Sequence, residues 1–433
     1  MLDIQFIREN KDTVAEKSRQ KGYEVDLDTL LERDAQRLDL LQTVENLRRQ
    51  RNENTQIIKQ AGGKPDQELI DKGKQIKVEL AKREDMLQET EVEWLNLLKK
   101  VPNMPLDDVP VGSLEAENVV LREVGEKSAF DFEPKNHAQI AEAKDWIDKE
   151  RAAKVAGSRF VYLKGDLVLL EFALWQFALH ALTDEKLISQ LVSENNLNLS
   201  TKPFVPVLPP AVAKTEVYDA TGRLNKEEQT YKLAEDDLWL NASAEHTMAP
   251  MYMNEVVEEK DLPLRFVGYT TAFRREAGTY GKDTEGIFRL HQFNKMEMET
   301  FSTPESSLQE HFLMVAVQEH LMQQLKLPYR VINKCTADIG GPNAKGVDID
   351  VWLPSQDAYR ETHTADLLTD YQTRRMNTRV RRVDGTIEFS HTNDATAFSE
   401  RPLVGIIENF QTKDGDVLVP EVLQQYMQGK EII

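Results

Sequence analysis

The sequence FRREAGTYGKDTEGIFRLHQFNKMEME, residues 273–299, is the most informative part of the chain. Its pattern predicts two strands joined by a loop that contains Gly278, Gly281 and Gly286. On alternate positions of the first strand, Arg274 and Glu276 face the same side. Charges of both signs stand beside apolar residues in both strands. Such a mixture suits a pocket that holds a polyanion and an ammonium group together.

The composition indicates two domains and a sizeable core, because the chain has 433 residues and 40% of them are hydrophobic. Cys335 is the only cysteine, which excludes an internal disulfide and a multi-cysteine zinc site, so no zinc is expected. The N-terminus lacks the basic and apolar regions of a signal peptide. The most apolar stretch, residues 167–179, contains Glu171 and Gln176 and is predicted to be a buried helix. We therefore expect a cytoplasmic protein without a membrane partner.

The charge of the chain is acidic overall but unevenly distributed. A net charge of −20 argues against a general nucleic-acid binder, and DNA is not an expected partner. Residues 46–82, however, hold nine Lys and Arg residues against five Asp and Glu residues. The chain therefore has a basic zone within its N-terminal segment.

Residues 27–100 are predicted to form two long helices that are broken at AGGKP, residues 61–65. Asp66 follows the proline as a favourable N-cap for the second helix. Apolar residues recur at heptad spacings, which predicts an antiparallel coiled-coil hairpin about 50 Å long. The predicted apolar positions are Leu27, Leu31, Leu38, Leu41 and Val44 in the first helix and Leu69, Ile76, Leu80, Leu87, Trp94 and Leu97 in the second.

Two interpretations of this hairpin are open: a dimerising or spacer coiled coil, and a lever that binds RNA phosphates. A solvated helix face usually mixes its charges evenly. Here the positive residues gather on both sides of the break, which favours RNA. These residues are Arg48, Arg49, Arg51, Lys59, Lys64, Lys72, Lys74 and Lys77.

A stiff linker is predicted after the hairpin, because VPNMPLDDVPVG, residues 101–112, contains three prolines. We expect the first domain to cover residues 1–112 and the second residues 113–433. The second domain shows no repeated βαβ alternation and no GxGxxG or P-loop sequence. An α+β fold with an antiparallel sheet flanked by helices fits better. Strands are predicted at residues 161–163, 238–240, 266–273, 288–293, 349–352 and 387–390, and helices at 167–182 and 306–325.

Three separated segments resemble motifs 1, 2 and 3 of class II aminoacyl-tRNA synthetases, in the order of that class. They are VLPP at residues 207–210, the stretch 273–299, and residues 393–408, where Arg401 begins the apolar helix PLVGIIENF. With the hairpin in front, the chain resembles a seryl-tRNA synthetase of bacterial type over nearly its whole length. This resemblance implies a helical arm, a class II catalytic domain, and a homodimer with motif 1 at its interface.

The resemblance also implies a site for ATP. Arg274 is expected to bind the α-phosphate with a guanidinium suited to paired oxygens, and Arg275 to assist at the nucleotide. Glu276 is expected to accept a hydrogen bond from the adenine amino group, and Phe293 to stack on the purine. Arg401 is expected to cover the other face of the purine or to reach the γ-phosphate.

A magnesium ion is expected between the phosphates of ATP. By resemblance Glu361 holds it, because hard cations prefer carboxylate oxygen, and Thr364 keeps a hydroxyl nearby. The implied catalytic residues are Arg274, Glu361 and Arg401.

The resemblance places serine recognition around LNASAEH, residues 240–246, where Ser243 stands in place of the usual threonine. Glu245 is expected to pair with the substrate ammonium. A site built to bond a hydroxyl rejects an analogue that lacks it by roughly 10⁴-fold. The implied serine-binding residues are Ser243, Glu245, Arg274, Glu297, Asn393 and Thr396.

Two segments depart from the pattern of the family. Where relatives have Glu-Ile-Ser-Ser-Cys-Ser-Asn, this chain has ETHTAD at residues 361–366. Where they have His-Thr-Leu-Asn-Gly-Ser-Gly, this chain has HTNDAT at residues 391–396, which we interpret as one residue shorter, with the hydroxyl either moved to Thr396 or lost. The four histidines His246, His291, His363 and His391 are too scattered to predict a metal site.

The implied reaction joins serine and ATP into seryl-adenylate and then transfers serine to the 3′ end of tRNA(Ser), and of tRNA(Sec) where it is present. The arm is expected to bind the tRNA mainly through its backbone and shape. Two alternatives remain. One is a synthetase-like ligase that charges a carrier protein, although relatives of that kind lack the arm. The other is a non-catalytic RNA-binding paralogue, which the presence of Arg274, Glu276, Glu361 and Arg401 disfavours.

Overall fold

The structure is a computed structural model, and it describes residues 1–60, 66–224, 230–276 and 286–433. The chain forms two compact units, Met1–Pro102 and Asn103–Ile433. The predicted break at residues 61–65 with Lys64, and the motif 2 glycines Gly278 and Gly281, lie outside the described residues.

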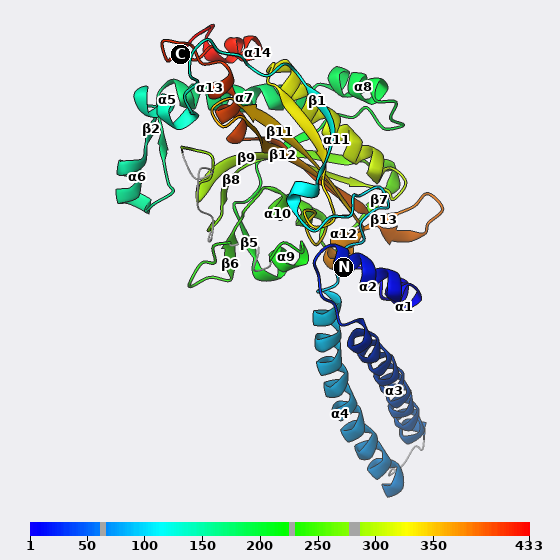
Figure 1. The fold of residues 1–433 in the computed structure, drawn as a ribbon. Coiled ribbons are helices and arrows are strands. Elements are labelled where there is room, and N and C mark those ends of the chain that lie inside the picture. The colour runs from blue at the N-terminus through cyan, green and yellow to red at the C-terminus, as the bar shows by residue number, and fades with distance from the viewer. Residues whose placement is uncertain (61–65, 225–229, 277–285) are drawn as a thin grey trace. The chain divides into compact units, whose positions relative to one another are not determined.

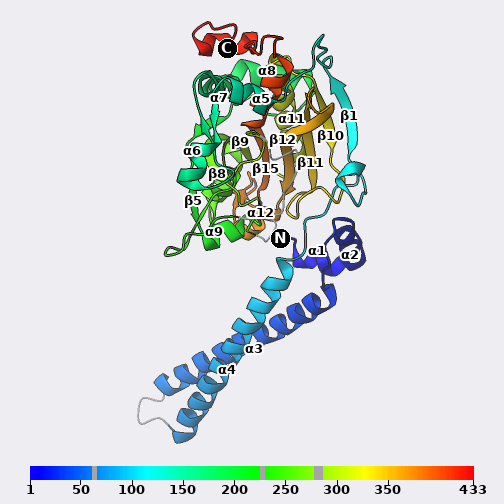
Figure 2. The ribbon, with the colours of Figure 1, turned by 60° about the vertical axis from the view of Figure 1, so that its left-hand side comes forward.

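The first unit is helical, and its two long helices pack antiparallel (Figures 1 and 2). Arg33 pairs with Glu93 at 3.0 Å, and Arg48 pairs with Glu84 at 2.7 Å, so positions further along one helix meet earlier positions of the other. The predicted hairpin is therefore confirmed. We call this pair of helices the arm. The helices of the unit are α1 (Ile4–Glu9), α2 (Lys11–Gln20), α3 (Leu27–Gln60) and α4 (Gln67–Leu98).

The apolar seam of the arm follows the prediction in α4 and departs from it in α3. Ile76 and Leu80 of α4 are buried, and Asp66 caps the helix by accepting from the backbone N–H of Glu68 at 3.1 Å. In α3 the buried side is formed by Leu27, Leu30, Leu40 and Val44. The predicted Leu38 is 44% exposed, because the buried face of a long helix drifts away from a strict seven-residue repeat.

Residues 103–112, predicted as a linker, instead pack onto the second unit. The backbone N–H of Asn103 donates to the carbonyl of Gly341 at 2.8 Å, and that of Leu106 donates to Ala344 at 2.9 Å. The Asn103 side chain also donates to the carbonyl of Leu368 at 2.7 Å. The prolines of this segment prevent a helix, but its other residues can still form backbone hydrogen bonds to the second unit.

The second unit is built on an eight-stranded sheet in the order β1-β10-β11-β12-β15-β9-β8-β4. Every neighbouring pair is antiparallel except β4 and β8, which are parallel. The α+β fold is confirmed. In this order the strands are β1 (Val119–Val124), β10 (Tyr329–Asn333), β11 (Lys345–Leu353), β12 (Ala358–Thr369), β15 (His391–Ser399), β9 (Gln292–Ser302), β8 (Leu264–Phe273) and β4 (Val205–Val207).

Three helices cover one face of the sheet: α7 (Asp166–Thr183), α11 (Ser307–Gln324) and α13 (Arg401–Asn409). Their buried side chains form one core with Met296 and Met298 of β9 and with Ala395 of β15. Since side chains alternate along a strand, the neighbouring residues point to the other face. There α10 (Glu245–Met248) packs on β8 and β9 through Met248, Phe266 and Phe301; in Figure 1 α7 lies above the sheet and α10 below it.

The shorter elements surround this framework. Small sheets pair β2 (Ile147–Asp148) with β3 (Tyr162–Leu163), β5 (Val212–Lys214) with β6 (Leu238–Leu240), and β13 (Arg379–Arg381) with both β7 (Val256–Glu258) and β14 (Ile387–Phe389). The remaining α-helices are α5 (His137–Ala143), α6 (Lys149–Ala156), α8 (Glu185–Glu194), α9 (Thr215–Ala220), α12 (Tyr371–Met376) and α14 (Glu421–Gln424). The 3₁₀ turns are η1 (Glu115–Glu117), η2 (Ala249–Tyr252), η3 (Glu259–Asp261) and η5 (Gln425–Met427).

Within the described residues, one helix, α7, has the length and apolarity of a membrane-spanning segment. Its buried side belongs to the main core, and its Glu171 accepts from the Asn294 side chain at 2.8 Å. The prediction of a buried helix is confirmed. The predicted strand at 288–293 is wrong in its first part, because β9 begins at Gln292 and residues 288–290 line a pocket instead.

Candidate active site

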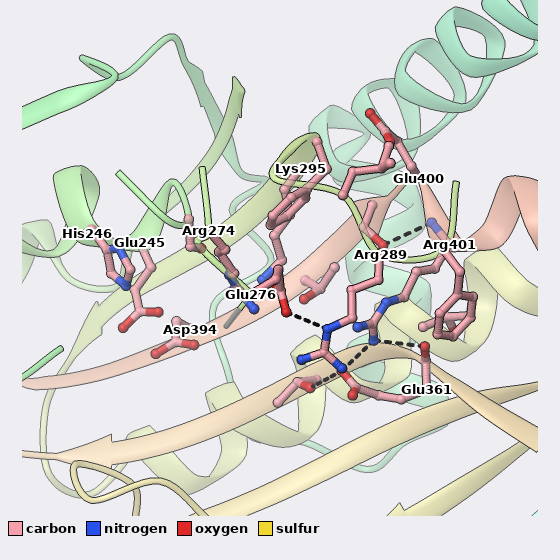
Figure 3. A pocket seen from close by; sticks show the side chains of 18 of the residues that line it. Glu245, His246, Arg274, Glu276, Arg289, Lys295, Glu361, Asp394, Glu400 and Arg401 are labelled. Atoms are coloured by element: carbon pink, nitrogen blue, oxygen red, sulfur yellow. Dashed lines mark hydrogen bonds and ion pairs between the residues drawn. The ribbon is translucent and has the colours of Figure 1, made fainter. Parts of the chain in front are cut away.

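A pocket of about 180 Å³ opens on the face of the sheet that α10 shares (Figure 3). Its floor comes from β9, β12 and β15, and its walls come from residues 287–290, from the N-terminus of α10 and from the start of α13. Figure 3 shows Glu245, His246 and Asp394 at one end, Arg289, Glu361 and Arg401 at the other, and Arg274 and Glu276 between them. The pocket therefore has a carboxylate end and an arginine end.

The arginine end contains Arg401, which begins α13 as predicted. Its Nη1 lies 3.1 Å from Oε1 of Glu361 and donates to the carbonyl of the same residue at 3.0 Å. Its guanidinium carbon lies 5.2 Å from the centre of the Phe288 ring. These contacts fix the guanidinium in the pocket before any ligand arrives.

Glu361 is ionised at this end of the pocket. The Glu361 side chain is 48% exposed. Exclusion of water alone raises the pKa of a carboxylate, but Arg401 and Lys334 outweigh it and lower the pKa of Glu361 to about 2. The hydroxyl of Thr364 donates to its Oε1 at 3.2 Å. An ionised carboxylate with a neighbouring hydroxyl is a fitting oxygen donor set for Mg²⁺.

Arg274 lines the same pocket as Arg401, although the two come from distant parts of the chain. Its Nε donates to the carbonyl of Ala242 at 3.1 Å, and its guanidinium carbon lies 5.3 Å from the centre of the Phe293 ring. The ring of Phe293 is thus presented beside a fixed cation. Arg275 is not in the pocket lining, because its guanidinium lies over Tyr231 at 4.6 Å and donates to the carbonyl of Thr230.

The expectation that Arg274 and Glu276 alternate along one strand is wrong. Strand β8 ends at Phe273, and Glu276 adopts a left-handed backbone conformation with φ of 47°. Glu276 nevertheless reaches the pocket and forms an ion pair with Arg289, a lining residue that the sequence did not single out. The turn at the end of β8, rather than strand alternation, thus brings Arg274 and Glu276 to the same pocket.

The carboxylate end gathers residues from three elements. Ser243 and Glu245 come from the start of α10, Asp366 from β12, and Asp394 and Thr396 from β15. The Ser243 hydroxyl donates at 2.7 Å to Glu297, which lies buried behind it on β9. Arg223 also lines this end, where its Nε donates to Oε1 of Glu245 at 2.6 Å.

Asn393, which was predicted to bind serine, does not line the pocket. The strand β15 pairs with β9 through His391, Asn393, Asp394 and Thr396, and Asp394 and Thr396 line the pocket. Alternation turns Asn393 to the helical face, where its side chain donates to the carbonyl of Ser307 at 2.9 Å. Residues two positions apart on a strand face the same side, so the predicted site residue Thr396 could have identified Asp394 as a lining residue.

The buried position of Glu400 predicts that the stability of the second unit depends on pH. Burial, with Glu171 nearby, raises the pKa of Glu400 from 4.5 to about 8, while the backbone N–H of Asn294 donates to it at 2.8 Å. Between these values the folded chain keeps a proton that the unfolded chain releases, so stability falls as pH rises through this window. We expect Glu400→Gln to reduce the fall of the unfolding free energy with pH by up to about 1.4 kcal/mol per pH unit.

Urea unfolding at a series of pH values between 5 and 8 measures this slope. Glu235→Gln is the matched control, because Glu235 is exposed. Equal slopes in the original chain and in Glu400→Gln contradict the prediction.

Comparison with known proteins finds a family match for each of the two units. Residues 1–105 match the seryl-tRNA synthetase N-terminal domain, and residues 229–410 match the tRNA synthetase class II core domain (G, H, P, S and T). The chain is 41% identical to a serine–tRNA ligase of Thermodesulfovibrio yellowstonii over 100% of both chains. It is 40% identical to one of Deinococcus radiodurans over 100% of this chain and 99% of the relative.

A solved structure gives the same result. The crystal structure of seryl-tRNA synthetase from Pyrococcus horikoshii complexed with ATP superposes with a TM-score of 0.86 at 35% identity, over 100% of this chain and 99% of that chain. The antiparallel sheet and its pocket are thus those of a class II aminoacyl-tRNA synthetase. Given the match of the arm as well, the chain belongs to the seryl-tRNA synthetase family.

Proposed function

We propose that the chain activates serine with ATP to give seryl-adenylate and pyrophosphate, and then transfers serine to the 3′ end of tRNA(Ser). One observation carries this proposal: a single pocket has fixed arginines at one end and buried carboxylates at the other. The arginine end suits the phosphates of ATP, and the carboxylate end suits the ammonium of an amino acid. The ligases and the ATP-bound structure to which the chain is similar support the same reaction.

At the nucleotide end, each residue has a distinct role. Arg274 binds the α-phosphate and Arg401 the purine face or the γ-phosphate, where preorganised positive charge stabilises the charge that develops as pyrophosphate leaves. Phe293 stacks on the adenine, and Glu276 accepts from its amino group. Mg²⁺, held by Glu361, supplies further positive charge between the phosphates.

At the amino-acid end, Glu245 and Asp394 pair with the ammonium of serine. Ser243, fixed by its bond to Glu297, and Thr396 offer hydroxyls toward the substrate side chain. Asp394 takes over the role that the sequence assigned to Asn393. A serine in this position presents its carboxylate toward Arg274 and the α-phosphate.

Serine-dependent exchange of pyrophosphate into ATP tests the first step, and charging of tRNA(Ser) tests the second. We expect both from the purified full chain. Exchange with another amino acid but not with serine contradicts the substrate assignment. Exchange without tRNA charging favours the carrier-protein ligase, and absence of exchange with retained RNA binding favours the non-catalytic paralogue.

We propose that the basic zone of the arm binds the tRNA backbone. All the described members of this set are exposed: Arg48, Arg49, Arg51, Lys59, Lys72, Lys74 and Lys77. Arg48 pairs with Glu84 and Lys74 with Asp71, but exposed pairs of this kind are weak and exchange readily for phosphate.

Replacing Lys72, Lys74 and Lys77 together with alanine is expected to lower kcat/KM for tRNA about tenfold or more, because each phosphate contact adds to affinity. Serine-dependent exchange should stay unchanged, since it requires no tRNA. The triple replacement with arginine, which keeps the charge, is the matched control and should charge tRNA normally. Equal charging by the alanine variant would remove the proposed role of the zone.

We also propose that the chain is a cytoplasmic homodimer. Apolar side chains are exposed at motif 1 and on the helix beside it: Leu208 of motif 1 is 84% exposed, and Phe172 of α7, a helix that packs against β4, is 56% exposed. A second copy that covers this patch removes it from water. Light scattering of Leu208→Glu tests the proposal, because a charge at a buried interface weakens the dimer, whereas an unchanged mass contradicts it.

A further inference from the structure

Arg223 brings a buried positive charge to the amino-acid end of the pocket. It follows α9 and Gly222, whose φ of +78° is the left-handed conformation that glycine adopts without strain. The turn directs the Arg223 side chain inward, where it is only 10% exposed. No part of the three class II motifs contains this residue, and the function proposed above gives it no role.

The guanidinium of Arg223 connects two of the carboxylates that line the pocket. Its Nε donates to Oε1 of Glu245 at 2.6 Å, and its Nη2 donates to Oδ2 of Asp394 at 3.2 Å. A third carboxylate, that of Asp366, lies 3.7 Å from the same Nη2. The side chain of Gln372 also donates to Oε1 of Glu245, at 3.2 Å. Donors from two directions thus fix the orientation of the Glu245 carboxylate.

The electrostatic surroundings explain why this end needs a cation. Burial, with Glu245 nearby, raises the pKa of Asp394 well above its ordinary value, and burial also raises the pKa of Asp366. Arg223 opposes both shifts by favouring the ionised form. The titratable and charged groups that face this cluster are Glu245 and His246 of α10, Lys295, Glu297 and Glu299 of β9, Lys334 after β10, Asp366 of β12, and Asp394 of β15.

We propose that Arg223 is a positioning and specificity-determining residue for the amino-acid step. It orients Glu245 and Asp394 toward the ammonium of the substrate, and its fixed charge restricts this acidic end to a single additional cation. A substrate with a second ammonium on its side chain is repelled. This inference rests on the proposed function, because it assigns Glu245 and Asp394 to the amine of the amino acid.

The proposal predicts a change that is specific to the amino acid. In Arg223→Gln, we expect the KM for serine in pyrophosphate exchange to rise about tenfold or more, because each carboxylate loses a charged hydrogen bond. The KM for ATP should stay within about twofold, since the nucleotide lies at the other end of the pocket. The acid limb of kcat/KM for serine should move upward by about one pH unit, because the carboxylates lose the charge that keeps them ionised.

Discrimination between substrates tests the charge of Arg223 directly. The probe is 2,3-diaminopropionate, which matches serine in length and carries an ammonium in place of the hydroxyl. We expect kcat/KM for this amino acid relative to serine to rise about tenfold in Arg223→Gln, since a like charge has been removed. Arg223→Lys keeps the charge but loses the planar fork, and it should retain the discrimination with an intermediate KM for serine.

The matched control is Arg375→Gln. Arg375 is also a buried arginine, and it donates to the backbone carbonyls of Asp219 and Ala220, just before Arg223, without lining the pocket. A structural effect of losing an arginine near α9 should appear equally in this variant. An equal rise in the KM for serine in Arg375→Gln overturns the proposal.

Three further results overturn it: an unchanged KM for serine in Arg223→Gln, a parallel rise in the KM for ATP, or an unchanged preference for serine over the diamine. If Arg223→Gln does not fold, the Arg223→Lys variant still decides, because lost discrimination there contradicts a role of the charge. Measurements on the unsubstituted chain distinguish the proposed function from the proposed role of Arg223. Absence of serine-dependent exchange in it refutes the proposed function itself, whereas exchange that is insensitive to Arg223 refutes only this inference.

Discussion

Replacing Arg401 with alanine is expected to lower kcat for serine-dependent pyrophosphate exchange by about 10²- to 10³-fold, the cost of losing one preorganised group that stabilises developing charge. The guanidinium is held in place by Glu361 and lies over Phe288, so it requires no rearrangement when the phosphates arrive. Steady-state exchange rates at saturating serine and ATP measure the effect.

Arg401→Lys and Arg122→Ala provide the controls for this prediction. Lysine keeps the charge without the planar fork and should recover only part of the rate. Arg122 also holds a glutamate, Glu319, through Nε at 2.9 Å and through Nη2, but it is not in the pocket lining. A loss of less than tenfold in Arg401→Ala, or an equal loss in Arg122→Ala, would show that Arg401 does not act on the phosphates.

The largest effect on stability is expected at Arg265 of β8. Its Nε and Nη2 each donate to an oxygen of Glu310 on α11 at 2.8 Å, and both side chains are almost fully buried, at 0% and 1% exposed. Arg265→Met leaves the Glu310 carboxylate buried without its cation. Loss of one partner of a buried pair costs about 3–5 kcal/mol, so we expect a destabilisation of this size in denaturant unfolding.

The double variant Arg265→Met with Glu310→Leu tests the physical reason. It removes both charges, and well-packed apolar replacements of a buried pair are often neutral, so it should recover much of the lost stability. Arg122→Ala again serves as a control, because its pair is partly exposed and such pairs contribute only about 0–1 kcal/mol. A double variant as unstable as the single one would mean that packing, not charge, is the cause.

The sequence predicted the parts of the fold that carry long apolar patterns. The arm, α7 and α11 have enough heptad or helical repeats for the period to be read, and Asp66 marks a helix start by its own chemistry. Strands β12 and β15 were missed, because one face of each carries the polar residues of the pocket. Segments such as ETHTAD and HTNDAT therefore lack the apolar alternation by which a strand is recognised.

The site was predicted where a motif carried it and missed elsewhere. Arg274, Glu276, Glu361 and Arg401 all line the pocket, and so do Ser243, Glu245 and Thr396. Asn393 was chosen over Asp394 because a one-residue ambiguity in aligning a strand exchanges its two faces. Arg223 left no signal in the sequence, since only the folding of a turn brings it to Glu245 and Asp394.

The docking of residues 103–112 onto the second unit fixes where the protein can be divided. Asn103, Leu106 and Pro110 form their backbone hydrogen bonds with Gly341, Ala344 and Thr336 of the catalytic unit, so a cut at residue 112 removes an integral strip of it. A junction at Pro102 spares that strip. The arm can therefore be exchanged at this junction without cutting into the catalytic unit.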